Sequence, residues 1–252
     1  EEEEARRARI NKVLEAFTQG EIEEHMVTHA PPALWCPHCV RATASRDPHR
    51  KERPEFRDVE VALDKVPTIF PDLMYLHKKG VNPNMVVVDH ESGRVWAHAL
   101  PDKSVLTGNG WIQQRMARDV DNAGHKDVKI MIKSDQERSM VALQHEIQRI
   151  RGAKTIPVNS PVGESEANGR VENAVRSVQE KVRTLKSHFE AETGVSLAED
   201  LPILTWLIRW AAELISKYNL GHDKKSSYER ARGVTSKKPI AMFGEAVWYL
   251  SL

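Results

Sequence analysis

The sequence predicts an α/β fold in which helices pack on a mixed β-sheet. Between residues 59 and 103, short apolar runs alternate with turn-forming residues, as in antiparallel strands. After residue 104 the apolar residues recur every three or four positions, and two short apolar runs interrupt these helical stretches. Antiparallel strands followed by strand–helix–strand units are typical of a mixed sheet covered by helices.

Length and composition narrow the class of protein. The 252 residues, 40% of them apolar, suffice for one large domain or for a core with a small appendage. The 37 basic and 36 acidic residues nearly balance, so total charge neither indicates nor excludes a nucleic-acid binder. Two neighbouring cysteines argue against a disulfide-stapled secreted fold. No apolar run reaches transmembrane length, and the four leading glutamates exclude a signal peptide at this end.

The first 58 residues divide into three parts. Residues 1–24 are highly charged with a small apolar stripe, which predicts a leader helix ending near Gly20. Residues 25–45 contain both cysteines and three histidines. Residues 46–58 combine Arg, Lys, Asp and Pro with little apolar content, so we expect an exposed linker, either a solvated spacer or a segment that follows a phosphate backbone.

The middle part has the residue types of a zinc site. His25 and His29 are four residues apart and share a helix face, while Cys36 and Cys39 form a Cys-x-x-Cys pair. Together they supply the four ligands of a tetrahedral Zn²⁺ site. A redox motif is the alternative, but the strand–helix unit that such motifs need is missing. His38 is a spare candidate ligand. The sequence therefore predicts a small zinc knuckle.

The remaining elements follow from apolar periodicity. A first strand is expected around Asp72, although Pro71 inside it is unfavourable for pairing. Residues 85–89 and 95–100 predict a hairpin. Later elements are helices within 104–122, about 140–150, 167–189 and 195–220, and strands at 128–132, 155–158 and 243–250. The aromatic residues of the 195–220 helix are expected to pack in the core.

Three stretches carry a family resemblance. They are Lys133-Ser134-Asp135-Gln136-Glu137, the run from Ser160 to Glu172, and Val182-Arg183-Thr184-Leu185-Lys186. They resemble the integrase core of Ty1/copia-type long-terminal-repeat retrotransposons, within the retroviral integrase superfamily. Such integrases share an Asp, a second Asp, and a Glu about thirty-five residues later. Here thirty-six residues separate Asp135 from Glu172. The resemblance extends from about His25 to Leu252.

The resemblance implies an RNase H-like core at residues 59–192 with a C-terminal helical extension at 193–252. It implies Asp72, Asp135 and Glu172 as the catalytic carboxylates, holding Mg²⁺ or Mn²⁺, with Asp64 as the alternative first acid. Two cations held by carboxylates can activate the attacking oxygen and stabilise the leaving oxygen of a phosphodiester. The family's zinc module also precedes its core. In the retroviral module a much longer insert separates the histidines from the cysteines, whereas here only six residues separate His29 from Cys36.

The implied activity is DNA integration, by 3′-end processing and strand transfer. Double-stranded DNA is the expected partner, with a homo-oligomer as the working form, the nucleus as its location and a polyprotein as its source. The expected DNA-binding residues share the helix of Glu172 and comprise Asn168, Arg176, Gln179, Arg183 and Lys186. Ordinary solvated helix residues are the alternative for this stripe. Two other functions stay open, an RNase H-like nuclease and a non-catalytic nucleic-acid-binding remnant of a decayed element.

Overall fold

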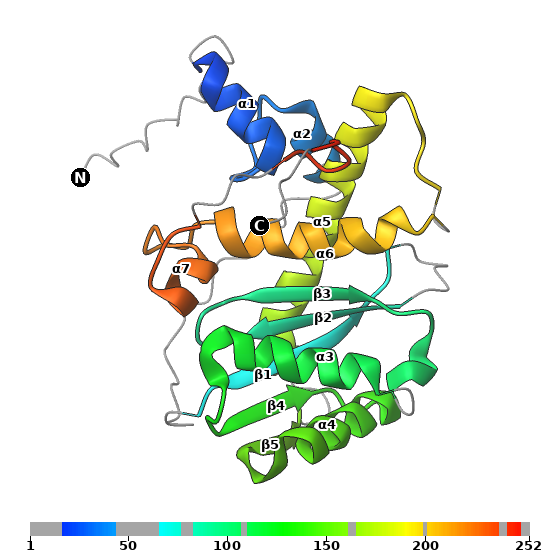
Figure 1. Cartoon of the computed structure of the whole chain (residues 1–252), viewed down its shortest axis with the longest axis vertical. Helices are drawn as coiled ribbons and strands as arrows, with labels where there is room; N and C mark the ends of the chain where they lie inside the picture. The colour runs from blue at the N-terminus through cyan, green and yellow to red at the C-terminus, as the bar shows by residue number, and fades with distance from the viewer. Residues whose placement is uncertain are drawn as a thin grey trace, which may run out of the picture.

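A five-stranded mixed sheet forms the centre of the molecule (Figure 1). The computed structural model describes residues 17–43, 66–76, 83–106, 110–160, 165–198, 201–236 and 241–247. Strand order is β3-β2-β1-β4-β5. The strands are β1 (Thr68–Met74), β2 (Asn84–Asp89), β3 (Val95–Ala99), β4 (Ile130–Ser134) and β5 (Thr155–Asn159). The first three pair antiparallel, and β4 and β5 run parallel to β1. The predicted RNase H-like sheet is confirmed.

Helices cover both faces of this sheet, because alternate strand residues point to opposite sides. Ile69 packs with α3 (Trp111–Val120) and α4 (Arg138–Arg151) on one face. Phe70 and Met74 pack with α5 (Ser165–Thr193) and α6 (Ile203–Tyr218) on the other. Every residue of β2 is buried, and each buried valine there contributes on the order of 1.5–3 kcal/mol. Thus α6, predicted as an extension, belongs to one apolar layer with α5.

Shorter elements connect these layers. They are η2 (Lys103–Leu106), the π-helical η3 (Asp121–His125), η4 (Gly152–Lys154) and α7 (Ser227–Arg232). Within the described ranges, every helix is too short or too polar to cross a membrane.

Pro71 lies inside β1 and is tolerated for a specific reason. The amide of His90 donates to the carbonyl of Thr68 at 2.9 Å. The backbone N–H and C=O groups of even-numbered residues in β1 therefore point toward β2, and those of odd-numbered residues point toward β4. The missing N–H of Pro71 therefore lies on the β4 side. Pairing with β4 covers only Thr68 and Ile69. The parallel ladder ends just where proline has no donor to offer.

The N-terminal prediction needs correction. Gly20 does not end a helix as predicted, because it lies in the first turn of α1 (Gln19–Thr28). Thr18 caps this helix: its hydroxyl accepts from the amide of Glu21, and the Glu21 carboxylate accepts from the Thr18 amide. The helix α2 (Pro37–Thr43) follows. Residues 1–16 and the predicted linker lie outside the described residues.

Two C-terminal predictions also change. The described residues 241–247 form no strand, and the rest of the strand predicted at 243–250 lies outside them. Trp206 is 75% exposed and is not a core residue. It lines a surface pocket together with Trp210 and Phe243. Trp210, however, packs against the core as predicted, beside aliphatic residues of α6 such as Leu207 and Ala211.

Candidate functional site

The sheet brings Asp72 and Asp135 to the same level. Ile69 pairs with Ile132 in the parallel β1–β4 ladder. Asp72 lies three residues after Ile69, inside β1, and Asp135 lies three residues after Ile132, directly after β4. Both carboxylates thus stand at the carboxyl ends of adjacent parallel strands. This is the edge at which α/β proteins commonly place ligands.

Hydrogen bonds fix the turn that carries Asp135. The amide of Glu137 donates to Asp135 Oδ1 at 3.3 Å, and the hydroxyl of Ser134 donates to the Asp135 carbonyl at 3.1 Å. Ser134 Oγ in turn accepts from the buried Gln144 amide at 2.7 Å. Gln144 also reaches the carbonyl of Val158 on β5 at 2.9 Å. The end of β4 is therefore anchored to α4 and β5.

The third predicted carboxylate, Glu172, lies on α5. Val171 and Val178 are buried against the face of the sheet that includes Phe70, and Glu172 is exposed beside them. Two turns after Glu172, the side-chain amide of Gln179 donates to the carbonyl of Tyr75 at 2.8 Å. This bond ties α5 to the carboxyl end of β1, the strand that carries Asp72.

The Asp72 carboxyl is subject to several negative charges. Burial raises the pKa of the Asp72 carboxyl to about 6, and the charges of Asp135, Glu172 and Glu137 raise it further, against a lowering hydrogen bond from the Leu73 amide. Glu137 is itself paired with Lys103 at 2.6 Å. Asp72 is therefore the half-buried centre of a cluster of negative charge.

Such a cluster suits hard divalent cations, which take carboxylate oxygens as ligands. In the described part of the chain, the one set of His, Cys, Asp and Glu side chains gathered around a single-ion position is His25, His29, Cys36 and Cys39. Asp72, Asp135 and Glu172 do not form such a set.

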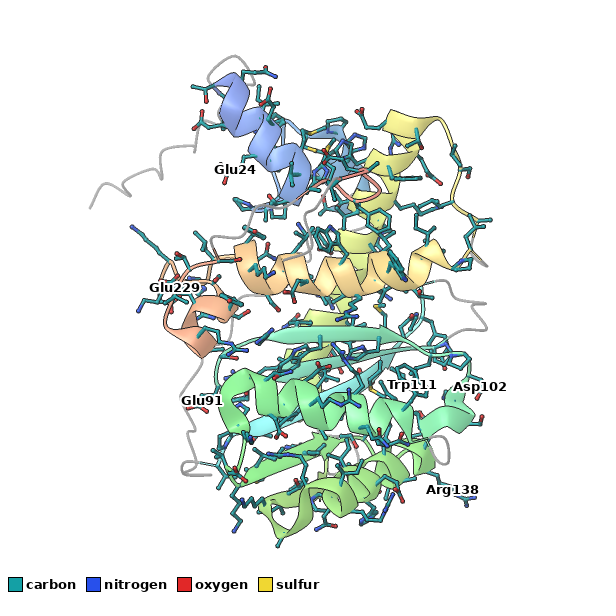
Figure 2. The ribbon with its side chains drawn as sticks, viewed as in Figure 1. Glu24, Glu91, Asp102, Trp111, Arg138 and Glu229 are labelled. Carbon is teal, nitrogen blue, oxygen red and sulfur yellow. The ribbon has the colours of Figure 1, made fainter. Side chains whose placement is uncertain are left out.

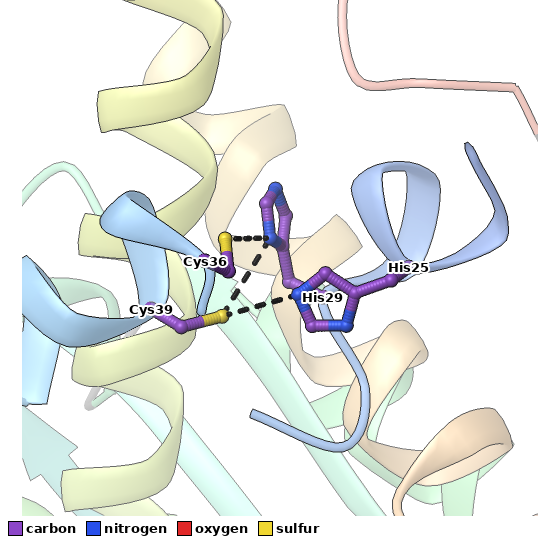
Figure 3. Close-up of side chains that lie close together, drawn as sticks. All are labelled: His25, His29, Cys36 and Cys39. Carbon is purple, nitrogen blue, oxygen red and sulfur yellow. Dashed lines mark hydrogen bonds between the residues drawn. The ribbon is translucent and has the colours of Figure 1, made fainter. Parts of the chain in front are cut away.

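The His and Cys side chains converge closely, with all four ligand atoms within 4.8 Å of one another (Figure 3). Nδ1 of His29 lies 3.4 Å from Cys36 Sγ and 3.6 Å from Cys39 Sγ, and Nε2 of His25 lies 3.6 Å from Cys39 Sγ. Ligands around tetrahedral zinc leave sulfur and nitrogen about 3.6 Å apart. The residues therefore fit a Cys₂His₂ zinc site.

The end of α1 and the start of α2 orient the candidate zinc ligands. Helix α1 ends at Thr28, and His29 takes a left-handed conformation with φ of 46° as its C-cap; histidine is one of the few residues with a side chain that favours this region. Pro37 starts α2 at its first position, where its missing N–H costs nothing. Cys36 and Cys39 consequently flank the first turn of α2 and face the His29 ring.

The protonation of Cys36 and His29 also suits a metal. Hydrogen bonds from the Cys39 thiol and from His25 and His29 hold the pKa of Cys36 far below its usual range, while the Cys36 thiolate raises the pKa of Cys39. Burial lowers the pKa of His29, which keeps its ring neutral. A thiolate and a neutral imidazole are the forms that bind zinc.

Three residues around this site were not singled out correctly by sequence. His38, the spare candidate, turns away and its Nδ1 contacts Ser187 Oγ at 3.0 Å. Lys181 and His188, both buried on α5, reach the zinc module. Burial lowers the pKa of Lys181 to about 8. Neither residue belongs to a local motif. The one signal in the sequence is that both stand next to the valine and leucine positions that form the buried face of this helix.

The predicted DNA-binding stripe has mixed roles. Gln179 is tied to β1, and Lys186 donates to the Glu190 carboxylate and to the Leu197 carbonyl. Arg183 is exposed, with its Nε donating to the Ala42 carbonyl at 3.3 Å. Arg176 is exposed and joins no other described residue by a hydrogen bond or ion pair. The side chain of Asn168, and all of Asp64, lie outside the described residues. Gln179 and Lys186 therefore have structural roles, and DNA contact stays a prediction for the two arginines.

No family model and no curated protein matches the chain. Solved integrase cores do align with it. The catalytic core of BIV integrase matches with 14% identity over 64% of this chain and 91% of that one, at a TM-score of 0.43. The HTLV-2 integrase core in complex with magnesium matches with 17% identity over 66% and 98%, at 0.47.

A chain of the simian T-cell lymphotropic virus intasome matches with 16% identity over 74% of this chain and 61% of that longer one, at a TM-score of 0.48. These neighbours are retroviral integrases, and their resemblance to this chain concerns the fold. Identities of 14–17% leave function to the geometry of this chain's own side chains.

The zinc site predicts which histidines matter. We expect wild-type protein to contain about one zinc ion per chain, and His25→Asn to lose it because the site then has three ligands. His38→Asn removes a neighbouring histidine that is not a ligand and should retain the metal. Inductively coupled plasma mass spectrometry of the purified proteins measures the content. Zinc-free wild type, or equal losses in both variants, would contradict this ligand set.

The charge cluster predicts a pH-dependent stability difference. Since the folded pKa of Asp72 is raised from 3.8 to about 6, its contribution to stability is complete below about pH 4 and is lost as pH rises through 6. In magnesium-free buffer at pH 7.5, Asp72→Asn should therefore stabilise the fold by about 1–2 kcal/mol. Urea unfolding at pH 4.5, 6 and 7.5, with and without Mg²⁺, measures this.

Mg²⁺ should stabilise the wild type and have little effect on Asp72→Asn. Glu91→Gln is the control. Glu91 projects from the β2–β3 turn (Figure 2), at the end of the sheet opposite to Asp72. A variant as stable as wild type at every pH, with the same response to Mg²⁺, would show that Asp72 does not belong to a cation-binding cluster.

Proposed function

We propose that this chain is a metal-dependent polynucleotidyl transferase that integrates DNA. The observation that carries the proposal is that Asp72 and Asp135 stand level at the carboxyl end of the β1–β4 pair, where burial and the charges of Asp135 and Glu172 raise the pKa of Asp72. Three carboxylates at the end of a mixed sheet are suited to hold two divalent cations. The reaction is 3′-end processing of element DNA followed by attack of its 3′-hydroxyl on a target phosphodiester.

In this proposal all three carboxylates would hold the cations. Asp72 would do so from β1, Asp135 from the anchored turn after β4, and Glu172 from α5. When bound, Mg²⁺ or Mn²⁺ supplies activation of the attacking oxygen and charge stabilisation of the leaving oxygen. The apolar packing beneath all three keeps their spacing fixed.

The motifs support a more specific origin. The stretches around Asp135, Glu172 and Arg183 favour a Ty1/copia-type retrotransposon integrase, released from a polyprotein and acting in the nucleus. Double-stranded DNA from the element and from the target is the proposed substrate, and a homo-oligomer is the proposed working form, since two DNA ends must join one target. The zinc module accompanies this core.

A nuclease of the RNase H type is the second candidate, because the same carboxylates would serve hydrolysis. The zinc module packed on α5 favours the integrase. A non-catalytic remnant is the third candidate, and the intact charge cluster argues against it. Product analysis separates the three: joined strands indicate an integrase, cleavage of hybrid RNA without joining a nuclease, and binding without either product a remnant.

Asp135→Asn and Glu172→Gln should each abolish strand transfer. Both substitutions keep the size of the side chain and remove the charge that a cation needs, so we expect a loss of about a thousand-fold or more. The assay is joining of short labelled duplex ends to plasmid DNA with Mg²⁺ or Mn²⁺. Glu91→Gln should retain activity, and circular dichroism should show all variants folded. Strand transfer by either acid variant at the wild-type rate would refute the assignment.

Arg176 should contact DNA phosphates, since it is exposed one turn beyond Glu172 on α5. Arg176→Ala should weaken binding to duplex ends and reduce the log–log salt slope by about one unit. Thermal stability should stay unchanged. Arg149→Ala, an exposed arginine of α4 on the opposite face of the sheet, is the control. Fluorescence anisotropy from 50 to 300 mM salt measures both quantities, and equal slopes for Arg176→Ala and wild type would place DNA elsewhere.

A further inference from the structure

Helix α5 is far longer than the sheet on which it packs. It runs from Ser165 to Thr193, and its second half extends past the strands to the N-terminal module, where α2 lies beside it (Figure 1). One rigid helix therefore carries Glu172 near one end and contacts the zinc ligands near the other. The contacts at that second end are unusually polar for a buried interface.

His188 on α5 binds the ring of a zinc ligand. Its Nδ1 lies 2.9 Å from His29 Nε2, and both side chains are buried. The other nitrogen of His29, Nδ1, faces both cysteine sulfurs. To ligate a metal through Nδ1, His29 must carry its proton on Nε2 and donate it to His188. An outer partner of this kind fixes the tautomer and the orientation of a ligating histidine.

Lys181 holds the chain that enters the site. Its side chain is 5% exposed, and its ammonium group donates to the carbonyls of Thr28 and His29. Those carbonyls belong to the end of α1, which has no further helical partner for them. Lys181 thus fixes the backbone of His29 while His188 fixes its ring.

Helix α2 is fastened to the same stretch of α5. The hydroxyl of Ser187 contacts His38 Nδ1 at 3.0 Å and accepts from Arg41 at 3.1 Å. Arg183 donates to the Ala42 carbonyl at 3.3 Å. Both halves of the zinc module, the histidine side and the cysteine side, are therefore bonded to residues 181–188.

We propose that the catalytic helix completes the zinc site: His188 positions His29 and Lys181 positions its backbone, so that zinc binding fastens the N-terminal module to α5. Neither residue is a ligand; both are positioning residues. The proposal rests on the zinc site of the proposed function and is independent of whether the carboxylates catalyse strand transfer. Zinc affinity and the order of residues 180–193 should accordingly rise and fall together.

Zinc affinity of His188 variants, in the full chain, is the first test. A chromophoric chelator competing for zinc should report a 10–100-fold weaker affinity for His188→Ala. His188→Asn should recover most of it, because an asparagine amide oxygen can accept at the position of histidine Nδ1. His145→Ala, at an exposed histidine of α4, is the control. Cobalt-loaded protein should show an altered visible ligand-field spectrum in the alanine variant and a wild-type one in the asparagine variant.

Hydrogen exchange of the wild-type chain, before and after zinc removal, is the second test. Amides of residues 180–193 should exchange faster without zinc, while those of β1, β2 and β4 should not change. Unchanged zinc affinity in His188→Ala, asparagine as weak as alanine, or unchanged exchange in residues 180–193 would overturn the proposal. Since neither readout requires DNA, a wild-type protein that binds zinc as expected but transfers no strand would refute only the proposed activity.

Discussion

The packing of α5 against the sheet is the contact on which the rest of the structure depends. Val171, Val178 and Leu185 form one apolar stripe that is buried over most of the helix. Their burial fixes the rotation of α5 about its axis and therefore the direction of every other side chain on it. The same valines and leucines orient Glu172, proposed as a catalytic carboxylate, and His188, which contacts His29. Both candidate metal sites share this one support.

The two ends of α5 are attached by different physical means. In the core, aliphatic side chains supply the free energy, and burial of such surface depends weakly on salt. At the zinc module, hydrogen bonds that involve Lys181, His188 and Ser187 dominate, and the buried apolar residues are few, such as Ala42. A module of this size depends on its metal for folding free energy. The attachment of the zinc module to α5 should therefore depend on bound metal, whereas the packing of the core does not.

Most of the architecture was predictable because apolar periodicity sets it directly. The hairpin of β2 and β3, the strands β4 and β5 and the helices α4 and α5 follow from that pattern. The start of α1 was missed although Thr18 and Glu21 form a recognisable capping pair. Lys181 and His188 were missed because their partners are more than 150 residues away in sequence. Long-range polar contacts leave no local pattern, whereas the zinc ligands, close in sequence, do.

Pro71 gives β1 a property that an ordinary strand residue would not. Any other residue at this position would present an N–H toward β4 and allow the ladder to continue toward Asp72 and Asp135. Continued pairing would commit the strand ends to each other as ordinary sheet. With proline there, the parallel ladder stops at Ile69 and Ile132, three residues before Asp72 and Asp135. A residue unfavourable for β-structure therefore marks where the paired part of the sheet gives way to strand ends that carry acidic side chains.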